Sequence, residues 1–157
     1  MKKTVAVIGS RGAIGNAVVD TLLADESVEA VFKFSRAENT EHEDKVKHIF
    51  IDIEDEESIK QATESLPEDT KFDLIFVATG ILHDEKNVFP EKSIKDISFD
   101  KLIKVLTINT IGPTLVGKYF IPYLRKDSKS TFAFLSARVG SISDNKLGGW
   151  YSYLSLI

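Results

Sequence analysis

The sequence predicts an α/β fold built on a doubly wound parallel sheet, and three observations lead to this prediction. Short apolar runs alternate along the chain with amphipathic stretches, which is typical of β-α-β units. The runs Val5–Ile8 and Leu74–Ala78 are continuously apolar, as expected of parallel strands covered by helices on both faces. A glycine-rich turn, Gly9–Gly15, lies directly between the first of these runs and a helical pattern.

Five segments have the short apolar character expected of strands. They are Thr4–Ile8, Ala30–Phe34, Lys47–Ile51, Leu74–Ala78 and Thr131–Leu135. Two segments are expected to be loops, Ala37–Lys45 because it is polar, and His83–Ser98 because it contains a proline and many charges.

The first helix is expected to begin near Ala13. Apolar residues recur every four positions along it and give it a core-facing stripe: Ile14, Val18 and Leu22. A second helix is expected after Asp55, with Glu56 and Glu57 in its first turn, where the helix dipole favours acidic groups. The longest helix is expected near Asp100–Leu124. Residues at spacings of three and four share one of its faces: Leu102, Leu106, Asn109, Pro113, Val116 and Phe120.

Length and composition bound the class of protein. A chain of 157 residues fits one domain with a buried core, here residues 1–157. The net charge is −4 and the basic residues are scattered, so no nucleic-acid-binding surface is expected. No apolar run is long enough for a signal peptide or a membrane span, and a cytoplasmic location is the default expectation.

The same composition argues against metal and disulfide chemistry. The chain has no cysteine, which excludes disulfides, thiolate zinc sites and a cysteine nucleophile. His42, His48 and His83 are far apart and share no ligand spacing, so no metal site is expected.

The glycine-rich turn predicts a dinucleotide site of the Rossmann type. Glycine is needed where the backbone turns tightly or approaches a pyrophosphate closely, and the helix that follows turns its free N–H groups toward the phosphates. The residues predicted to bind in this way are Gly9, Ser10, Arg11, Gly12, Ile14 and Gly15. The alternative is a tight connection between strand and helix that binds no ligand.

The end of the second strand favours NADP(H) over NAD(H). An acidic residue at this place usually accepts hydrogen bonds from the ribose of NAD, but here the strand ends in Ser35 and Arg36. The planar guanidinium of Arg36 suits a 2′-phosphate, and Arg11 is a candidate for a second positive charge. The alternative is that both arginines are simply solvated surface residues.

Two motifs late in the chain carry a resemblance to a known family. The run Ser136–Ser143, followed by Gly148–Tyr153, resembles the catalytic segment of short-chain dehydrogenases/reductases, in particular the C-factor-like and carbonyl-reductase-like branch. The resemblance extends from Lys3 to Tyr153 and implies hydride transfer between a nicotinamide cofactor and a small carbonyl or alcohol. It also implies that Asp52 and Ile53 flank the adenine, and that Ala78, Thr79 and Gly80 line the ribose, where the family more often has Asn-Ala-Gly.

The resemblance also assigns catalytic roles. Tyr153 is the expected proton donor, with Tyr151 as the alternative if the register is shifted. The serine that helps to hold the carbonyl oxygen is either Ser136, by its place at the end of a strand, or Ser141, by its spacing from the tyrosine. Pro113 has no N–H to bond to the main-chain carbonyl of Asn109, four residues before it, so that carbonyl is free to accept another donor. The resemblance implies that it holds a relay water.

One element of the family pattern is missing. In the family a lysine follows the tyrosine by four residues and lowers its pKa, but here that position is Ile157. We therefore expect a chain truncated within the tyrosine helix, without the C-terminal strands and helices of the family, and with impaired turnover. The alternatives are a non-catalytic dinucleotide-binding or signalling module and, from the glycine spacing alone, an epimerase-like enzyme acting on nucleotide sugars. A homo-oligomer is compatible with the sequence.

Overall fold

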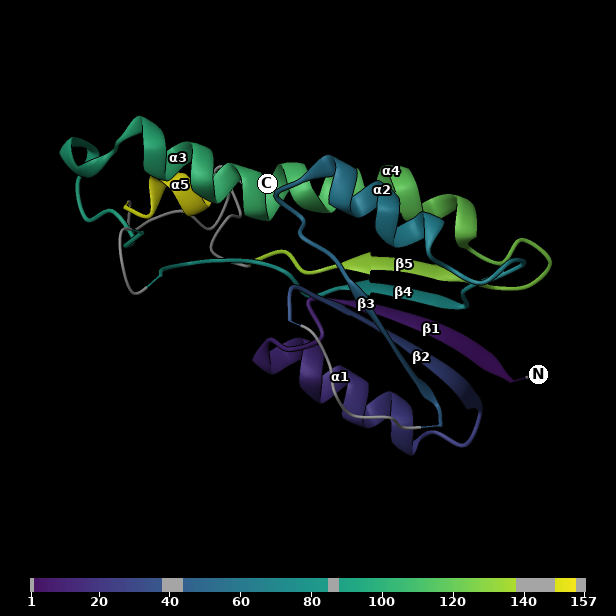
Figure 1. Cartoon of the computed structure of the whole chain (residues 1–157). Coiled ribbons are helices and arrows are strands. Elements are labelled where there is room, and N and C mark those ends of the chain that lie inside the picture. Colours follow the sequence, from purple (N-terminus) through teal and green to yellow (C-terminus); the bar gives the residue numbers. More distant parts are fainter. Residues whose placement is uncertain (1, 38–43, 85–87, 138–148, 155–157) are drawn as a thin grey trace.

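The sheet in the computed structural model contains five parallel strands and has the order β3-β2-β1-β4-β5 (Figure 1). The model describes residues 2–37, 44–84, 88–137 and 149–154. The strands are β1 (Lys3–Ile8), β2 (Val28–Ser35), β3 (Val46–Phe50), β4 (Leu74–Val77) and β5 (Thr131–Phe134). Every pairing between neighbours is parallel, so the carboxyl ends of all five strands lie at one edge.

Helices cover both faces of the sheet, which confirms the predicted doubly wound fold class (Figure 1). Helix α1 (Ala13–Ala24) lies on one face. On the other face lie α2 (Glu56–Glu64), α3 (Phe99–Leu106) and α4 (Gly112–Phe120). A short helix, α5 (Tyr151–Leu154), packs beside α3, and 3₁₀ turns occupy Ile94–Asp96 and Ile121–Tyr123.

The core is divided between these two faces because successive side chains of a strand point to opposite sides. In β1, Val5 and Val7 pack with Val19 of α1. Ala6 and Ile8 belong to the larger cluster on the other face, which includes Ile59 of α2 and Val116 and Phe120 of α4. Strand β1 is therefore the continuously apolar, doubly covered strand that its sequence predicts.

The predicted core-facing stripe of α1 is wrong at its first position. The side chain of Ile14 is 56% exposed, whereas the neighbouring residue Gly15 is buried together with Val19. Val18 and Leu22 are partly buried against the same cluster. The helix approaches the turn after β1 so closely at Gly15 that this glycine, rather than the large side chain beside it, faces inward.

The predicted long helix near Asp100–Leu124 is present but interrupted. A π-helical turn, Thr107–Ile111, separates α3 from α4, and the N–H of Gly112 bonds to the carbonyl of Thr107, five residues back. Pro113 has no N–H, and its ring would crowd the carbonyl of Asn109 in a regular α-helix. The widened turn accommodates the proline, and it lies at the candidate residue Asn109.

The strand order places a crevice at the middle of the sheet. Strand β1 lies between β2 and β4, so the connection after β1 and the connection after β4 pass to opposite faces. Ligands of open α/β sheets bind at such a point, outside the carboxyl ends of the strands.

Candidate functional site: a cleft at the carboxyl ends of the strands

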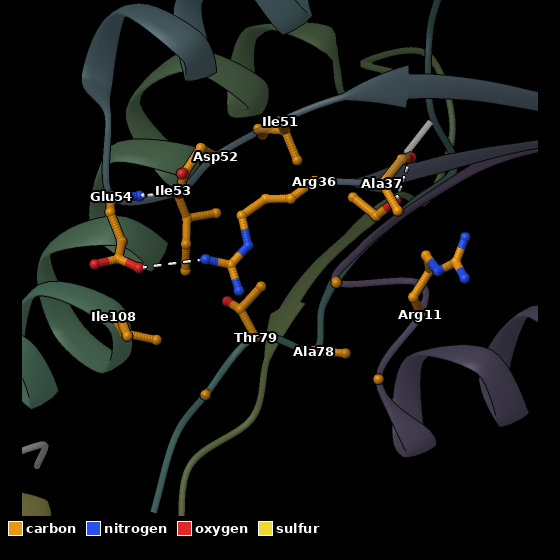
Figure 2. A pocket seen from close by; sticks show the side chains of 14 residues that line it. Arg11, Arg36, Ala37, Ile51, Asp52, Ile53, Glu54, Ala78, Thr79 and Ile108 are labelled. Atoms are coloured by element: carbon orange, nitrogen blue, oxygen red, sulfur yellow. Dashed lines mark hydrogen bonds and ion pairs between the residues drawn. The ribbon is translucent and has the colours of Figure 1, made fainter. Parts of the chain in front are cut away.

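A cleft of about 380 Å³ lies at this point, at the carboxyl ends of β1, β2, β3 and β4 (Figure 2). Most of the predicted cofactor-binding residues line it, namely Gly9, Arg11, Gly12, Ser35, Arg36, Asp52, Ile53, Ala78, Thr79 and Gly80. They come from four separate segments of the chain, which the parallel sheet brings to one place. The turn after β1 therefore faces a crevice, as the dinucleotide prediction requires.

At two glycines of the turn, Gly9 and Gly15, the backbone leaves no room for a side chain. Gly9 has a φ of +82°, and a Cβ there would lie 2.9 Å from Cγ2 of Thr79. A Cβ on Gly15 would lie 2.2 Å from the carbonyl oxygen of Gly9, which is too close for any packing. The same carbonyl accepts the N–H of Gly12 at 3.1 Å. The turn is thus tight, and α1 begins directly beneath it.

The amino end of α1 is open toward the cleft. Its N-cap is Gly12, so no side chain caps the first N–H groups, and no acidic residue lies in its first turn. Uncapped N–H groups and the helix dipole together favour an anion at this place.

Three predicted members of the turn do not line the cleft. Ser10 is fully buried and its hydroxyl donates to the carbonyl of Phe34 at 3.2 Å, so its side chain ties the turn to the end of β2. The side chain of Ile14 is exposed, and Gly15 packs against Gly9. Their observed roles are structural, and a ligand contact through their backbone stays a prediction.

The two arginines of the cleft lie apart (Figure 2). Arg36 follows β2, and its guanidinium points across the cleft toward Glu54, with 3.6 Å between Nη1 of Arg36 and Oε1 of Glu54. Arg11 extends from the glycine turn on the opposite side. Ser35, the residue before Arg36, also lines the cleft, and its hydroxyl donates to the carbonyl of Ala37 at 3.3 Å. The predicted roles of Arg36 at a 2′-phosphate and of Arg11 as a second positive charge stay predictions.

Asp52 caps the backbone after β3 and also lines the cleft. Its Oδ1 accepts the N–H of Glu54 at 3.0 Å, and its own N–H donates to the hydroxyl of Ser58 at 2.9 Å. These bonds set the direction in which the chain leaves the strand, and so place Ile53 and Glu54 at the wall of the cleft.

The segment after β4 presents a polar atom with no partner. Oγ1 of Thr79 is buried and has no hydrogen-bond partner within the described residues. Such atoms are rare in proteins because each one costs about 1–3 kcal/mol. Thr79 lines the cleft, so a ligand bound there could complete its hydrogen bonding.

Asn109 fixes the segment that follows Gly80. Its Oδ1 accepts the N–H of Ile81 at 2.7 Å, and its Nδ2 donates to the carbonyl of Ile81 at 2.8 Å. This pair of bonds joins the π-helical turn to the wall of the cleft, where Ile108 also contributes. The expected role of the main-chain carbonyl of Asn109 stays a prediction.

The other predicted catalytic residues are Ser136, Ser141 and Tyr153, and their roles stay predictions. Ser136 is exposed and lies just beyond the end of β5, and Ser141 lies outside the described residues. Tyr153 is in α5, with its ring 6.3 Å from that of Trp150. Among the described residues, no hydrogen bond joins Asn109, Ser136 and Tyr153.

Five residues that line the cleft or contact the segment of Tyr153 were not predicted from the sequence. Ala37, Ile51, Glu54 and Ile108 line the cleft, and Glu91 is a buried carboxylate that binds the segment containing Tyr153. For Glu54 a signal existed, because it lies two residues beyond Asp52 on the same strand end. Glu91 lies in a charged loop segment, and nothing in its spacing distinguishes it.

The described residues include no group of three or more histidine, cysteine, aspartate or glutamate side chains that could hold a metal ion. Within the same part of the chain, no helix is long and apolar enough to cross a membrane.

Comparison with known proteins decides the family. The model of the short chain dehydrogenase family matches residues 3–153, nearly the whole chain. The chain belongs to this family. The resemblance expected from the sequence is therefore confirmed.

Two curated relatives match parts of this family member. 1-Hydroxy-2-glutathionyl-2-methyl-3-butene dehydrogenase of Rhodococcus sp. (strain AD45) is 28% identical over 104 residues, which are 66% of this chain and 42% of that protein. The C-signal of Myxococcus xanthus is 31% identical over 61 residues, which are 39% of this chain and 37% of that protein. The matched segments thus span less than half the length of each relative.

Solved structures of short-chain dehydrogenases share the fold over nearly all of this chain. Carbonyl reductase Sniffer of D. melanogaster superposes with a TM-score of 0.82 at 18% identity, covering 99% of this chain and 70% of that chain. The NADPH-bound carbonyl reductase from chicken fatty liver gives a TM-score of 0.79 at 24% identity, covering 99% of this chain and 65% of that chain.

Proposed function

We propose that this chain forms the dinucleotide-binding part of an NADP(H)-dependent short-chain oxidoreductase that interconverts a small carbonyl compound and its alcohol. Family membership supports the reaction class. The observation that supports the cofactor is the cleft itself, which is lined by the uncapped end of a helix, by an arginine and by Thr79, whose buried hydroxyl has no partner among the described residues. The chicken carbonyl reductase, which shares this fold, binds NADPH, and this is consistent with the choice of cofactor.

The residues of the cleft fit the parts of such a cofactor. The glycine turn and the first N–H groups of α1 would hold the pyrophosphate. Arg36 would bind the 2′-phosphate, and Thr79 would donate its hydroxyl to the ribose side. Asp52 and Ile53 would line the adenine. The bound cofactor supplies the hydride, and Asn109 keeps the wall beyond Gly80 in place through its two bonds to Ile81.

The roles of the catalytic residues remain predictions. Tyr153 would donate the proton, and Ser136 or Ser141 would hold the carbonyl oxygen. Since Ile157 stands where the family has a lysine, we expect turnover by this chain to be weak or undetectable.

Replacing Arg36 by alanine should remove the preference for NADP⁺. A charge-assisted hydrogen bond from an exposed arginine is expected to contribute about 1.4 kcal/mol, so the dissociation constant for NADP⁺ should rise about tenfold. NAD⁺ has no 2′-phosphate, and its dissociation constant should change by less than about twofold. Isothermal calorimetry of both nucleotides with wild type and variant measures these constants.

The matched control is Lys60→Ala, which removes one positive charge from α2 at a residue that pairs with Glu57 and Glu64 outside the cleft. It should leave both constants unchanged. Equal affinity of the wild-type chain for NADP⁺ and NAD⁺ would refute the proposed preference, and binding of neither nucleotide would refute the proposed function.

Replacing Thr79 by valine should affect the free protein and the complex in opposite directions. Valine keeps the methyl group that packs near Gly9 and removes a buried hydroxyl without a partner, so the melting temperature should stay equal or rise. If the hydroxyl bonds to the ribose, NADP⁺ should bind roughly fivefold more weakly.

Thr110→Val is the control for this prediction. The hydroxyl of Thr110 is also buried without a partner in the described part of the chain, but Thr110 does not line the cleft. Its replacement should change stability in the same sense and leave nucleotide affinity unaltered. A Thr79 variant that binds NADP⁺ as well as wild type would remove the hydroxyl from the proposed contact set.

A non-catalytic dinucleotide-binding module is the second candidate function. It is favoured by the similarity of part of the chain to the C-signal and by Ile157 at the lysine position. An assay of NADPH consumption with generic aldehydes separates the two candidates. Nucleotide binding without consumption supports the binding module, and consumption supports the oxidoreductase.

A further inference from the structure

Glu54 lies at the wall of the cleft and faces Arg36 (Figure 2), and it also pairs with a second cation, Lys104. It follows β3, where Asp52 fixes its backbone by accepting its N–H. Its side chain is 23% exposed, and its carboxylate pairs with Lys104 of α3 through Oε2 and with Arg36 through Oε1. No other acidic residue of the described chain pairs with Arg36.

The two contacts of Glu54 differ in strength. Nζ of Lys104 lies 2.5 Å from Oε2 of Glu54, a direct charged hydrogen bond. Nη1 of Arg36 lies 3.6 Å from Oε1, beyond hydrogen-bond distance, and the arginine side chain is 69% exposed. An exposed ion pair of this kind contributes little, so Arg36 can leave Glu54 easily, whereas Lys104 keeps the carboxylate in place.

We propose that Glu54 is a specificity-determining residue, which holds Arg36 in the free protein and competes with the 2′-phosphate of NADP(H) for its guanidinium. This inference rests on the proposed function. When the phosphate binds, Arg36 exchanges one anionic partner for another. Lys104 then neutralises the carboxylate that Arg36 has left, which limits the repulsion between Glu54 and the phosphate.

The preference for NADP(H) is therefore set by the difference in free energy between two interactions of Arg36, one with the 2′-phosphate and one with Glu54. Glu54 weakens the binding of nucleotides with a 2′-phosphate and has no such effect on NAD(H). Lys104, which does not line the cleft, favours the binding of these nucleotides because it pairs with the carboxylate of Glu54. Both residues are positioning residues for Arg36.

Replacing Glu54 by glutamine tests the proposal, because it keeps the shape of the side chain and removes its charge. The dissociation constants for NADP⁺ and for 2′,5′-ADP should fall roughly threefold to fivefold, and that for NAD⁺ should change by less than about twofold. Lys104→Met should shift the same two constants the other way, by roughly threefold. Calorimetry on the full chain measures all three ligands, and 2′,5′-ADP reports on the phosphate without the nicotinamide half.

The matched control is Glu56→Gln on α2. Glu56 accepts from Lys118 of α4 at 2.7 Å, a similar carboxylate–ammonium pair that joins neighbouring elements outside the cleft. This variant should leave all three constants unchanged.

The outcomes separate the inference from the function on which it rests. If wild type prefers NADP⁺ and Glu54→Gln leaves that preference unchanged or reduces it, the role of Glu54 is overturned and the proposed function stands. If wild type binds neither NADP⁺ nor 2′,5′-ADP, both are overturned. A tighter NADP⁺ complex of Glu54→Gln, with NAD⁺ unaffected, supports both.

Discussion

Alanine at Gly15 should destabilise the fold by about 3 kcal/mol or more and abolish nucleotide binding. The new Cβ would lie 2.2 Å from the carbonyl oxygen of Gly9 and 2.9 Å from its carbonyl carbon, so the backbone of the turn or the whole of α1 must move. Alanine normally stabilises a helix interior by about 1 kcal/mol relative to glycine, and this gain is too small to offset the clash. Urea unfolding followed by circular dichroism, with calorimetry of NADP⁺, measures both effects.

Gly12→Ala is the matched control in the same turn. A Cβ at Gly12 would lie 3.4 Å from the same carbonyl oxygen, and its φ of −68° suits any residue. Alanine is a poorer N-cap than glycine, so this variant should lose about 1 kcal/mol, well below the loss expected at Gly15. Equal stability of the Gly15 and Gly12 variants would mean that α1 does not approach the turn as closely as described.

The contrast between these glycines shows how far the sequence alone could go. The spacing Gly9, Gly12 and Gly15 between an apolar run and a helical pattern was enough to predict the turn, because few other contexts require glycine so regularly. The separate tasks of the three could not be predicted. They depend on the distance between α1 and the turn, which is a property of the packed structure.

The strands were predictable for a related reason, and the helix faces were less so. Strands covered on both sides must be apolar throughout, and this pattern survives without knowledge of the partner elements. The inward face of α1 is different, because a helix that packs closely through Gly15 turns its large neighbour Ile14 outward. A pattern of apolar residues does not reveal that a glycine is the point of closest contact.

In the candidate site too, some residues could be predicted from the sequence and others could not. Residues next to strand ends, such as Arg36 and Asp52, could be predicted to meet because parallel strands end at one edge. Lys104 reaches Glu54 from a helix 50 positions along the chain, and the unpartnered hydroxyl of Thr79 exists only in the packed cleft. No local pattern in the sequence marks either of them.

Glu91 is the clearest case of a buried polar contact without a sequence signal. The residue is 3% exposed. Oε2 accepts the N–H of Ser152 at 3.3 Å, Oε1 accepts the hydroxyl of Ser152, and its backbone carbonyl accepts the N–H of Trp150 at 2.7 Å. Gly149, with a φ of +77°, allows the close approach, since a Cβ there would lie 2.9 Å from that carbonyl oxygen. These contacts anchor the segment that carries Tyr153.

Glu91→Ala should therefore loosen the tyrosine segment while leaving the nucleotide cleft intact. The variant removes the acceptor of two buried donors of Ser152, and we expect a loss of about 2 kcal/mol in the free energy of local opening. That corresponds to roughly 30-fold faster amide exchange at Trp150 and Ser152. Hydrogen–deuterium exchange measures it. Fluorescence of Trp150, the one tryptophan of the chain, gives a second readout.

Two further variants make this prediction strict. Glu91→Gln keeps an acceptor for the hydroxyl of Ser152 and should lose less than Glu91→Ala. Combining Glu91→Ala with Ser152→Ala removes the hydroxyl along with its acceptor, so the double variant should cost less than the two single variants added together. The affinity for NADP⁺ should stay at the wild-type value in all of them, because neither residue lines the cleft. Additive costs, or unchanged exchange at Trp150, would mean that the tyrosine segment is held by its packing on α3 rather than by Glu91.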